Sequence, residues 1–199
     1  MIVEAEKNFV TIPADRKEEL KKLSTYISSK QKAGIAIHLT FICTHNSRRS
    51  HIAQILAQTA AAYYQIPMIN CYSGGTEITA FNSNAVKALS DIGFNIISDE
   101  APTNPVYKVY DGATSAGLII YSKKYNDAPN PAQSFAAIMT CSQADESCPF
   151  VPGAEARFKL TYEDPKLGDG TPQQAAIYKE RCLQIATEMI YTFHLANKA

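Results

Sequence analysis

The sequence lacks a net charge. Its 19 Lys and Arg residues balance 19 Asp and Glu residues, so no overall field draws the chain towards nucleic acid or an anionic membrane surface. It also lacks an apolar run approaching the roughly 20 residues needed to cross a bilayer. Its first residues, MIVEAEKNFV, show no basic segment followed by an apolar one. We therefore expect a cytoplasmic protein that binds neither nucleic acid nor membrane, and any bound anion must be attracted by local groups.

The chain also has too few cysteines for a secreted disulfide scaffold. There are five in 199 residues, and they are scattered. In a reducing cytosol such thiols are more often reactive, ligating or buried. We expect Cys71, in a predicted strand, and Cys182, on a predicted helix, to be ordinary buried thiols. The other three cysteines carry the functional argument.

The order of apolar patterns predicts an α/β fold. Hydrophobic residues make up 46% and charged residues 19% of the chain, which are ordinary globular values. Buried strands are predicted near residues 35–43, 68–73 and 135–141, and amphipathic helices near 50–64, 83–94 and 173–194. Because strands and helices alternate, we expect a central parallel sheet with helices on both faces.

We expect residues 1–199 to form a single domain with two additions. Residues 1–34 form a predicted N-terminal helical extension, in which a helix begins near Pro13 and ends before Gly34. Residues 104–133 hold two β-prone runs, VYKVY and GLIIYS, separated by DGATSA. This pattern predicts an inserted β-hairpin.

The loop CTHNSRRS, between the first strand and its helix, carries the main chemical signal. Five residues separate Cys43 from Arg49, enough to curl into a cradle whose backbone N–H groups point at one centre. The positive end of the following helix adds to it. Such a cradle suits a tetrahedral oxyanion such as phosphate, sulfate or arsenate. The predicted substrate-binding residues are Thr44, His45, Asn46, Ser47, Arg48 and Arg49.

Cys43 is the predicted nucleophile of this loop. Amide donors, the helix N-terminus and Arg49 all stabilise a thiolate. Arg49 also offers a planar fork suited to two substrate oxygens, and Ser50 could donate a hydrogen bond to the sulfur. Asn46 is expected to tie the loop together or to adopt a left-handed backbone conformation.

A second informative stretch is MTCSQADESCPF, in which Cys141 and Cys148 are seven positions apart. Zinc sites typically place about two to four residues between ligands and need a second pair, so we expect no metal. Exchange along three sulfurs, from Cys43 to Cys141 to Cys148, is one interpretation; two unconnected cysteines are the other. Asp164 precedes Pro165, which favours either a general acid or a simple turn.

These motifs resemble the low-molecular-weight protein tyrosine phosphatase superfamily. The phosphatase pattern is Cys-x-Gly-Asn-x-Cys-Arg-Ser, and the stretch CSQADESCP resembles the pair of resolving cysteines in the thioredoxin-coupled arsenate reductase branch. The similarity spans roughly residues 36–103 and 136–193. The matching positions are Cys43, Asn46, Arg49, Ser50 and Asp164-Pro165.

The resemblance implies a mechanism for arsenate reduction. Cys43 would attack arsenate while Asp164 assists the departure of a hydroxyl, and Cys141 would then attack Cys43 and release arsenite. Cys148 would attack Cys141, and thioredoxin would reduce the resulting disulfide. Thioredoxin is therefore the expected partner, and no cofactor is expected.

Three positions depart from the family pattern. His45 replaces the loop glycine, which implies an unusual backbone angle or an imidazole at the pocket rim. Arg48 replaces the second loop cysteine, and Arg48 and His51 favour a solvated basic rim. Gln54 stands where some reductases carry a glutamate that helps to bind potassium, so the resemblance does not carry that ion over to this chain.

Two alternatives to arsenate reduction remain open. Cys43, Arg49 and Asp164 would suffice for a phosphatase that hydrolyses phosphotyrosine or small phosphoesters. A non-catalytic oxyanion or redox sensor would use the thiols only to report oxidation.

Overall fold

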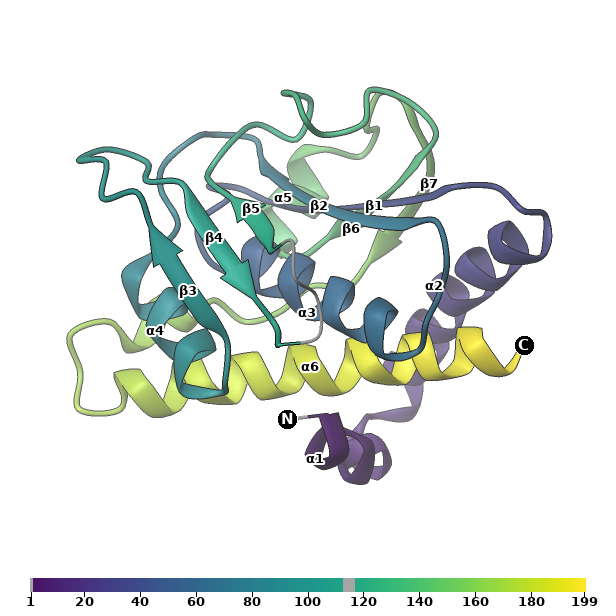
Figure 1. Cartoon of the computed structure of the whole chain (residues 1–199), viewed down its shortest axis with the longest axis horizontal. Coiled ribbons are helices and arrows are strands. Elements are labelled where there is room, and N and C mark those ends of the chain that lie inside the picture. Colours follow the sequence, from purple (N-terminus) through teal and green to yellow (C-terminus); the bar gives the residue numbers. More distant parts are fainter. Residues whose placement is uncertain (1, 113–116) are drawn as a thin grey trace.

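A computed structural model describes residues 2–112 and 117–199. A four-stranded sheet in the order β2-β1-β6-β7 forms its centre, and every neighbouring pair is parallel (Figure 1). The strands are β1 (Ile37–Cys43), β2 (Ile69–Gly75), β6 (Phe135–Met139) and β7 (Ala154–Lys159). The predicted parallel sheet is thus confirmed. β7 was not predicted, because its residues alternate between half-buried and exposed at the edge of the sheet.

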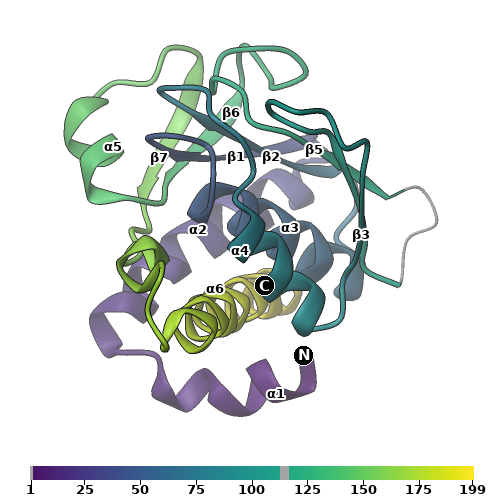
Figure 2. The same ribbon diagram turned by 90° about the vertical axis from the view of Figure 1, so that its left-hand side faces the viewer.

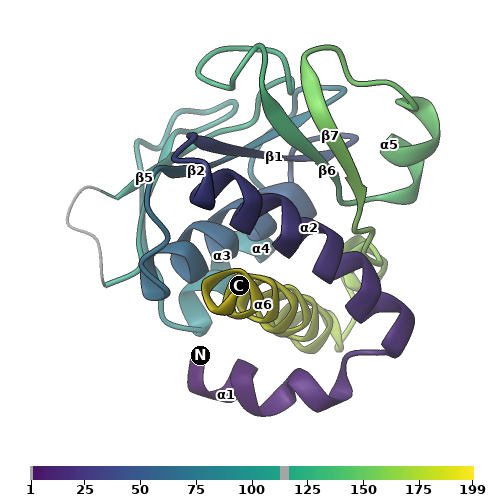
Figure 3. The same ribbon diagram turned by 90° about the vertical axis from the view of Figure 1, so that its right-hand side faces the viewer.

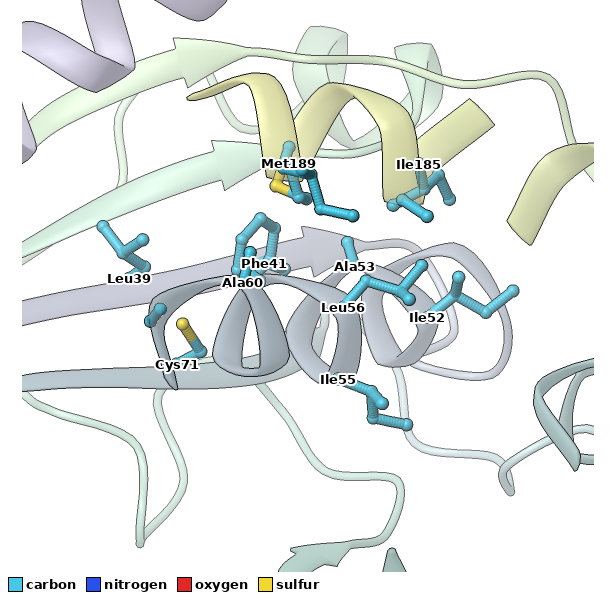
Figure 4. Packing of buried hydrophobic residues seen from close by; sticks show 14 of the residues in the cluster. Leu39, Phe41, Ile52, Ala53, Ile55, Leu56, Ala60, Cys71, Ile185 and Met189 are labelled. Carbon is cyan, nitrogen blue, oxygen red and sulfur yellow. The ribbon is translucent and has the colours of Figure 1, made fainter. Parts of the chain in front are cut away.

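The long helices cover one face of this sheet. They are α2 (Ala14–Lys32), α3 (Arg49–Tyr63), α4 (Ser83–Asp91) and α6 (Gln174–Lys198), with α1 (Ile2–Lys7) and the short η1 (Asn8–Thr11) before them. α6 lies along α2 and α3, and α1 lies on the far side of α6 (Figure 3). Figure 4 shows Ala53 and Leu56 of α3 facing Ile185 and Met189 of α6, and all four are buried. Among the described helices, none is long and apolar enough to span a membrane.

The other face of the sheet has a thinner cover. Phe135, Ala137 and Met139 of β6 are buried there. The short α5 (Ser142–Ser147) packs on them, together with loop segments around Tyr125 and Val151. Helices therefore lie on both faces, as predicted, but the only helix on the second face among the described residues is the six-residue α5. This face lies next to the predicted thiol pair.

A separate antiparallel sheet flanks the helices (Figure 2). It consists of β3 (Asn95–Ser98), β4 (Tyr107–Tyr110) and β5 (Leu118–Ile120) in that order. β4 and β5 form the hairpin expected within residues 104–133, and part of the predicted turn DGATSA lies outside the described residues. β3 was not predicted. The sheet joins the main core through the buried Val109 and Ile120.

The N-terminal extension packs tightly on this body. The predicted helix is α2, which begins directly after Pro13. Leu20, Leu23 and Ile27 recur at helical spacing and are fully buried. Gly34 follows the helix with φ 65°, a conformation that suits glycine after a helix end. The division of the chain into one domain, an extension and an insertion stays a prediction.

Candidate functional site

The loop between β1 and α3 turns its carbonyl groups outwards. The Thr44 carbonyl accepts from the Glu77 N–H at 2.8 Å, and the Ser47 carbonyl accepts from the Asn82 N–H at 2.9 Å. By contrast, the backbone N–H groups of residues 44–49 donate to no other group within residues 2–112 and 117–199. A row of unpaired donors at a helix N-terminus is an anion-binding arrangement.

Asn46 holds this loop in shape. It is fully buried and has φ 43°, so the left-handed residue of the loop is Asn46 and not His45. Its Oδ1 accepts from the Lys123 backbone N–H at 2.9 Å. Because a backbone N–H can only donate, the amide orientation is fixed and Nδ2 donates to Ser50 Oγ at 2.9 Å.

Ser50 in turn faces the sulfur of Cys43. Ser50 Oγ lies 3.1 Å from Cys43 Sγ. Since Ser50 Oγ already accepts from Asn46, its own proton is available to the sulfur. Cys43 is only 3% exposed and thus lies at the base of the loop. The hydrogen bonds from Lys123 through Asn46 and Ser50 thus end at this sulfur.

The loop is backed by a close approach of β2. A Cβ added at Gly75 would lie 2.7 Å from the Thr44 carbonyl oxygen and 2.8 Å from the Asn46 nitrogen. Real side chains do not tolerate such contacts with backbone atoms. Gly75 is therefore required by the proximity of two backbones, a use of glycine that its missing side chain permits.

Arg49 reaches a second segment that carries Asp164. Its Nη2 lies 2.6 Å from Asp164 Oδ2, and its Nη1 donates to the Tyr162 carbonyl at 3.0 Å. Its Nε is buried and has no partner among the described residues. Asp164 caps η2 (Pro165–Gly168) by accepting from the Lys166 N–H. The guanidinium is thus held in place through Nη1 and Nη2, while the nitrogen Nε makes no hydrogen bond.

Two other residues of the loop lie next to carboxylates, with the His45 side chain 49% exposed and the Arg48 side chain 15% exposed. His45 is exposed, and its Nε2 lies 3.4 Å from Glu77 Oε2. Arg48 donates from Nε to Tyr178 Oη at 2.6 Å and from Nη2 to Asp169 Oδ2 at 2.8 Å. Burial raises the pKa of Asp169, but the hydrogen bond from Tyr178 and the charge of Arg48 hold it below its usual value. The guanidinium of Arg48 thus forms an ion pair with Asp169.

His51 was expected on a solvated rim, and this expectation is wrong. The side chain is fully buried, and its Nδ1 lies 3.1 Å from Ser73 Oγ. Burial and the nearby charge of Lys123 lower the pKa of His51 well below its usual value, so the ring is neutral. Its position on the inner face of α3 agrees with helical spacing, because His51 lies four residues before the buried Ile55.

The three cysteines of the predicted relay lie close to one another in the fold. Cys43 and Cys141 are both buried, next to the C-terminal ends of the neighbouring strands β1 and β6. Thr44 Oγ1 lies 3.5 Å from Cys141 Sγ, and that sulfur also accepts from the Ala144 N–H at 3.3 Å. Cys148 is half-buried and packs against the same cluster. All are free thiols.

The helix between Cys141 and Cys148 is tied to the edge strand β7. Asp145 on α5 forms ion pairs with Arg157 and, at 2.9 Å, with Lys159. Arg157 Nε also donates to the Cys148 carbonyl at 3.3 Å. Asp145 is 9% exposed, but Arg157 and Lys159 are 29% and 61% exposed, so solvent screens these ion pairs and they contribute little to stability.

Lys123, which was not predicted as a site residue, lies behind the loop. It is 4% exposed, and burial lowers its pKa to about 8. Its backbone N–H holds Asn46, and its Nζ donates to the Tyr121 carbonyl at 3.3 Å. No pattern in the sequence marks a lysine as buried. By contrast, the pair Gly74-Gly75 was a visible signal of close packing.

The other cysteines are buried thiols, as predicted. Cys71 and Cys182 are 4% and 0% exposed. Burial raises the pKa of Cys71 and brings that of Cys182 to about 12. In the part of the chain that the structure describes, no three His, Cys, Asp or Glu side chains gather as a metal site would require.

Known structures share this architecture. A low-molecular-weight protein tyrosine phosphatase from Bacillus subtilis superposes with a TM-score of 0.52 at 16% identity, covering 81% of this chain and 98% of its own. One from T. tengcongensis gives 0.52 at 16% identity, covering 78% and 97%. The chain therefore has the low-molecular-weight phosphatase fold, with the Cys43 loop at the C-terminal edge of its sheet.

Sequence comparison finds arsenate reductases among the similar proteins. An arsenate reductase of Shouchella clausii is 27% identical over 134 residues, which are 67% of this chain and 78% of the relative. One of Bacillus subtilis is 27% identical over 141 residues, or 71% and 83%. No family model matches the chain. The predicted resemblance to this superfamily, and to its arsenate reductases, is thus confirmed.

Proposed function

We propose that this protein is an arsenate reductase that works through a relay of three thiols. The observation that carries the proposal is the set of unpaired donors around a buried sulfur: the N–H groups of residues 44–49 and Nε of Arg49. A tetrahedral oxyanion would satisfy them together. The position of Cys141 beside Thr44 supports reduction over hydrolysis, and sequence relatives carry the name arsenate reductase.

In the first step the loop from Thr44 to Arg49 binds arsenate. The sulfur of Cys43 attacks arsenic, so that a sulfur–arsenic bond forms and an arsenic–oxygen bond breaks. Asp164, next to Arg49, donates the proton with which the oxygen leaves as water. The unpaired N–H groups stabilise the charge that develops on the remaining oxygens.

In the second step Cys141 attacks the sulfur of Cys43. A disulfide forms, the sulfur–arsenic bond breaks, and its electron pair stays on arsenic, which leaves as arsenite. The Ala144 N–H, which already points at Cys141 Sγ, stabilises the attacking thiolate. Thr44 keeps this sulfur adjacent to the loop.

In the third step Cys148 attacks Cys141 and releases Cys43 as a thiolate. The seven positions between the two cysteines span roughly 10 Å along a helix, at about 1.5 Å per residue. A disulfide requires Cα atoms within about 7 Å. α5 must therefore unwind, and the surface ion pairs of Asp145 must open. Thioredoxin then supplies the two electrons that reduce Cys141–Cys148.

Phosphatase action is the second candidate. Cys43, Arg49 and Asp164 form a set that could also transfer a phosphoryl group to sulfur and hydrolyse it, without using Cys141 or Cys148. A redox or oxyanion sensor would require the thiols but no turnover. The thiol relay also supports a cytoplasmic location, because free thiols persist in a reducing compartment.

One assay separates these functions. Reduced protein is mixed with arsenate, thioredoxin, thioredoxin reductase and NADPH, and NADPH oxidation is compared with the hydrolysis of an aryl phosphate. We expect arsenate-dependent oxidation that Cys148→Ser abolishes and that Cys182→Ser, a change at a buried thiol away from the site, leaves intact. Hydrolysis without NADPH oxidation would identify a phosphatase. If neither occurred while oxidation still produced a reversible Cys141–Cys148 disulfide, the protein would be a sensor.

A further inference from the structure

A buried ion pair joins the N-terminal extension to the C-terminal helix. Arg16, in the first turn of α2, donates from Nε and Nη2 to Glu188 Oε2 at 2.9 and 2.7 Å. Their side chains are 16% and 4% exposed. Gln184 donates to the other carboxylate oxygen of Glu188. The N-terminal extension therefore supplies the cation that this carboxylate needs.

The same guanidinium packs on Tyr162. The central carbon of Arg16 lies 4.8 Å from the centre of the Tyr162 ring, within the range of a cation–π contact. Tyr162 is 6% exposed, and its pKa is raised well above the usual value, mainly by burial and also by the charge of Glu188. The ring is thus a neutral group held against a charged one.

Tyr162 is connected to the oxyanion loop through its backbone. Its N–H donates to the Thr140 carbonyl at 3.1 Å, and its carbonyl accepts from Arg49 Nη1 at 3.0 Å. Two residues later, Asp164 binds Arg49 Nη2. Both of these partners of the Arg49 guanidinium therefore come from a single short segment, and Arg16 holds the ring at its start.

We propose that Arg16 and Glu188 are positioning residues for Arg49: they fix Tyr162, and the segment from Tyr162 to Asp164 fixes the guanidinium that binds the oxyanion. The assignment of Arg49 as an anion ligand rests on the proposed function. Arg49 must present its unused Nε to the anion at a defined angle, and small displacements of such a group weaken both binding and turnover. The N-terminal extension is then a support of the site.

The test uses the full chain and inorganic phosphate, an oxyanion that the thiols do not reduce. Arg16→Met alone leaves the Glu188 carboxylate buried without a cation, so the working variant replaces both with Met, an exchange of a buried pair that leaves stability nearly unchanged. We expect its dissociation constant for phosphate, measured by calorimetry, to rise about fivefold. Lys21→Met, at an exposed position on the same helix, is the matched control and leaves the constant unchanged.

A double-mutant cycle separates positioning from general loosening. In the Arg49→Lys background, the double Met variant should cause no further loss of phosphate affinity, since the effect passes through Arg49. A full fivefold loss in that background, or an unchanged constant with Arg49 intact, overturns the proposal.

A readout without ligand keeps the two proposals apart. The NMR signal of the Arg49 Nε–H group should shift in the double Met variant and stay in place in Lys21→Met. An Arg49 signal that does not respond overturns the positioning role, whatever the affinity. A wild-type protein that binds no phosphate contradicts the proposed function instead.

Discussion

The loop of residues 44–49 and the segment from Cys141 to Cys148 lie at the same edge of the central sheet, yet they are held by different interactions. The loop is held from behind by the buried Asn46 and by the close approach of Gly75. The cysteine segment is a six-residue helix fastened through Asp145 to charged side chains of an edge strand. Buried contacts thus hold the loop in place, whereas ion pairs with exposed side chains hold the cysteine segment.

This difference matches two chemical tasks. Binding and attacking an oxyanion require donors that are already in place, because reorganisation at the moment of reaction costs free energy. Passing a disulfide from Cys141 to Cys148 requires the chain between them to change shape. A short surface helix, with few buried contacts, opens locally at low cost.

The largest effect is expected from a change in the locked region. Gly75→Ala places a methyl group against the Thr44 carbonyl and the Asn46 nitrogen, so we expect the free energy of unfolding to fall by about 4 kcal/mol. We expect phosphate binding to be lost. Gly34→Ala, where a Cβ meets nothing within 4 Å but φ is 65°, should lower stability by only about 1 kcal/mol and leave binding intact. Equal losses of binding in the two variants would show that the loop is not locked by Gly75.

The second largest effect is a pH dependence of stability, caused by the buried Lys123 behind the loop. Burial lowers the pKa of Lys123 from 10.5 to about 8, so the folded state releases this proton at lower pH than the unfolded state. Relative to Lys123→Met, the wild type should therefore gain about 3 kcal/mol of stability as pH rises from 8 to 10.5. His51 lies close to this charge and stays neutral across the range.

Denaturant unfolding of both proteins at several pH values measures this difference. Lys124→Met changes the exposed neighbouring lysine and is the control, with a difference from wild type that does not vary with pH. A constant difference for Lys123→Met as well would mean that the ammonium is not destabilised by burial.

The smallest effect on stability is expected in the cysteine segment. Asp145→Asn removes the ion pairs with Arg157 and Lys159 and should change the free energy of unfolding by less than about 1 kcal/mol. Because α5 must open before Cys141 and Cys148 can join, disulfide formation should become about threefold faster, as for a barrier lowered by roughly 0.7 kcal/mol. Quenching the reaction at intervals and quantifying the Cys141–Cys148 disulfide by mass spectrometry gives the rate, because thiol exchange leaves the number of free thiols unchanged. Glu146→Gln, at an exposed position of the same helix, should leave the rate of disulfide formation unchanged. A slower rate in Asp145→Asn would contradict the idea that the ion pairs of Asp145 hold α5 closed.

The same contrast explains what could be predicted from the sequence. β1, the loop and α3 follow one another along the chain, so their pattern and the spacing of Cys43 and Arg49 were sufficient to locate them. His51 lies four residues before the buried Ile55, so helical periodicity could have placed it on the inner face of α3. The burial of Lys123 depends on residues far along the chain, and local periodicity carries no trace of it. The pair of Arg16 and Glu188 lies 172 positions apart in sequence.

Short helices and strands could not be predicted for a related reason. β3 has four residues, and β7 has only half of its residues turned inwards, so neither produces the apolar run that identified β1 and β6. The two-turn start of the chain, α1 with η1, is stabilised by packing against α6 and not by a pattern of its own.

A single turnover tests the central claim most directly. Reduced protein receives excess arsenate without thioredoxin, and the products are quantified and mapped by mass spectrometry. The account predicts one arsenite per chain, a disulfide between Cys141 and Cys148, and Cys43 recovered as a free thiol, with no arsenite from Cys43→Ser. Arsenite formed by Cys43→Ser, or a disulfide that includes Cys71 or Cys182, would contradict it.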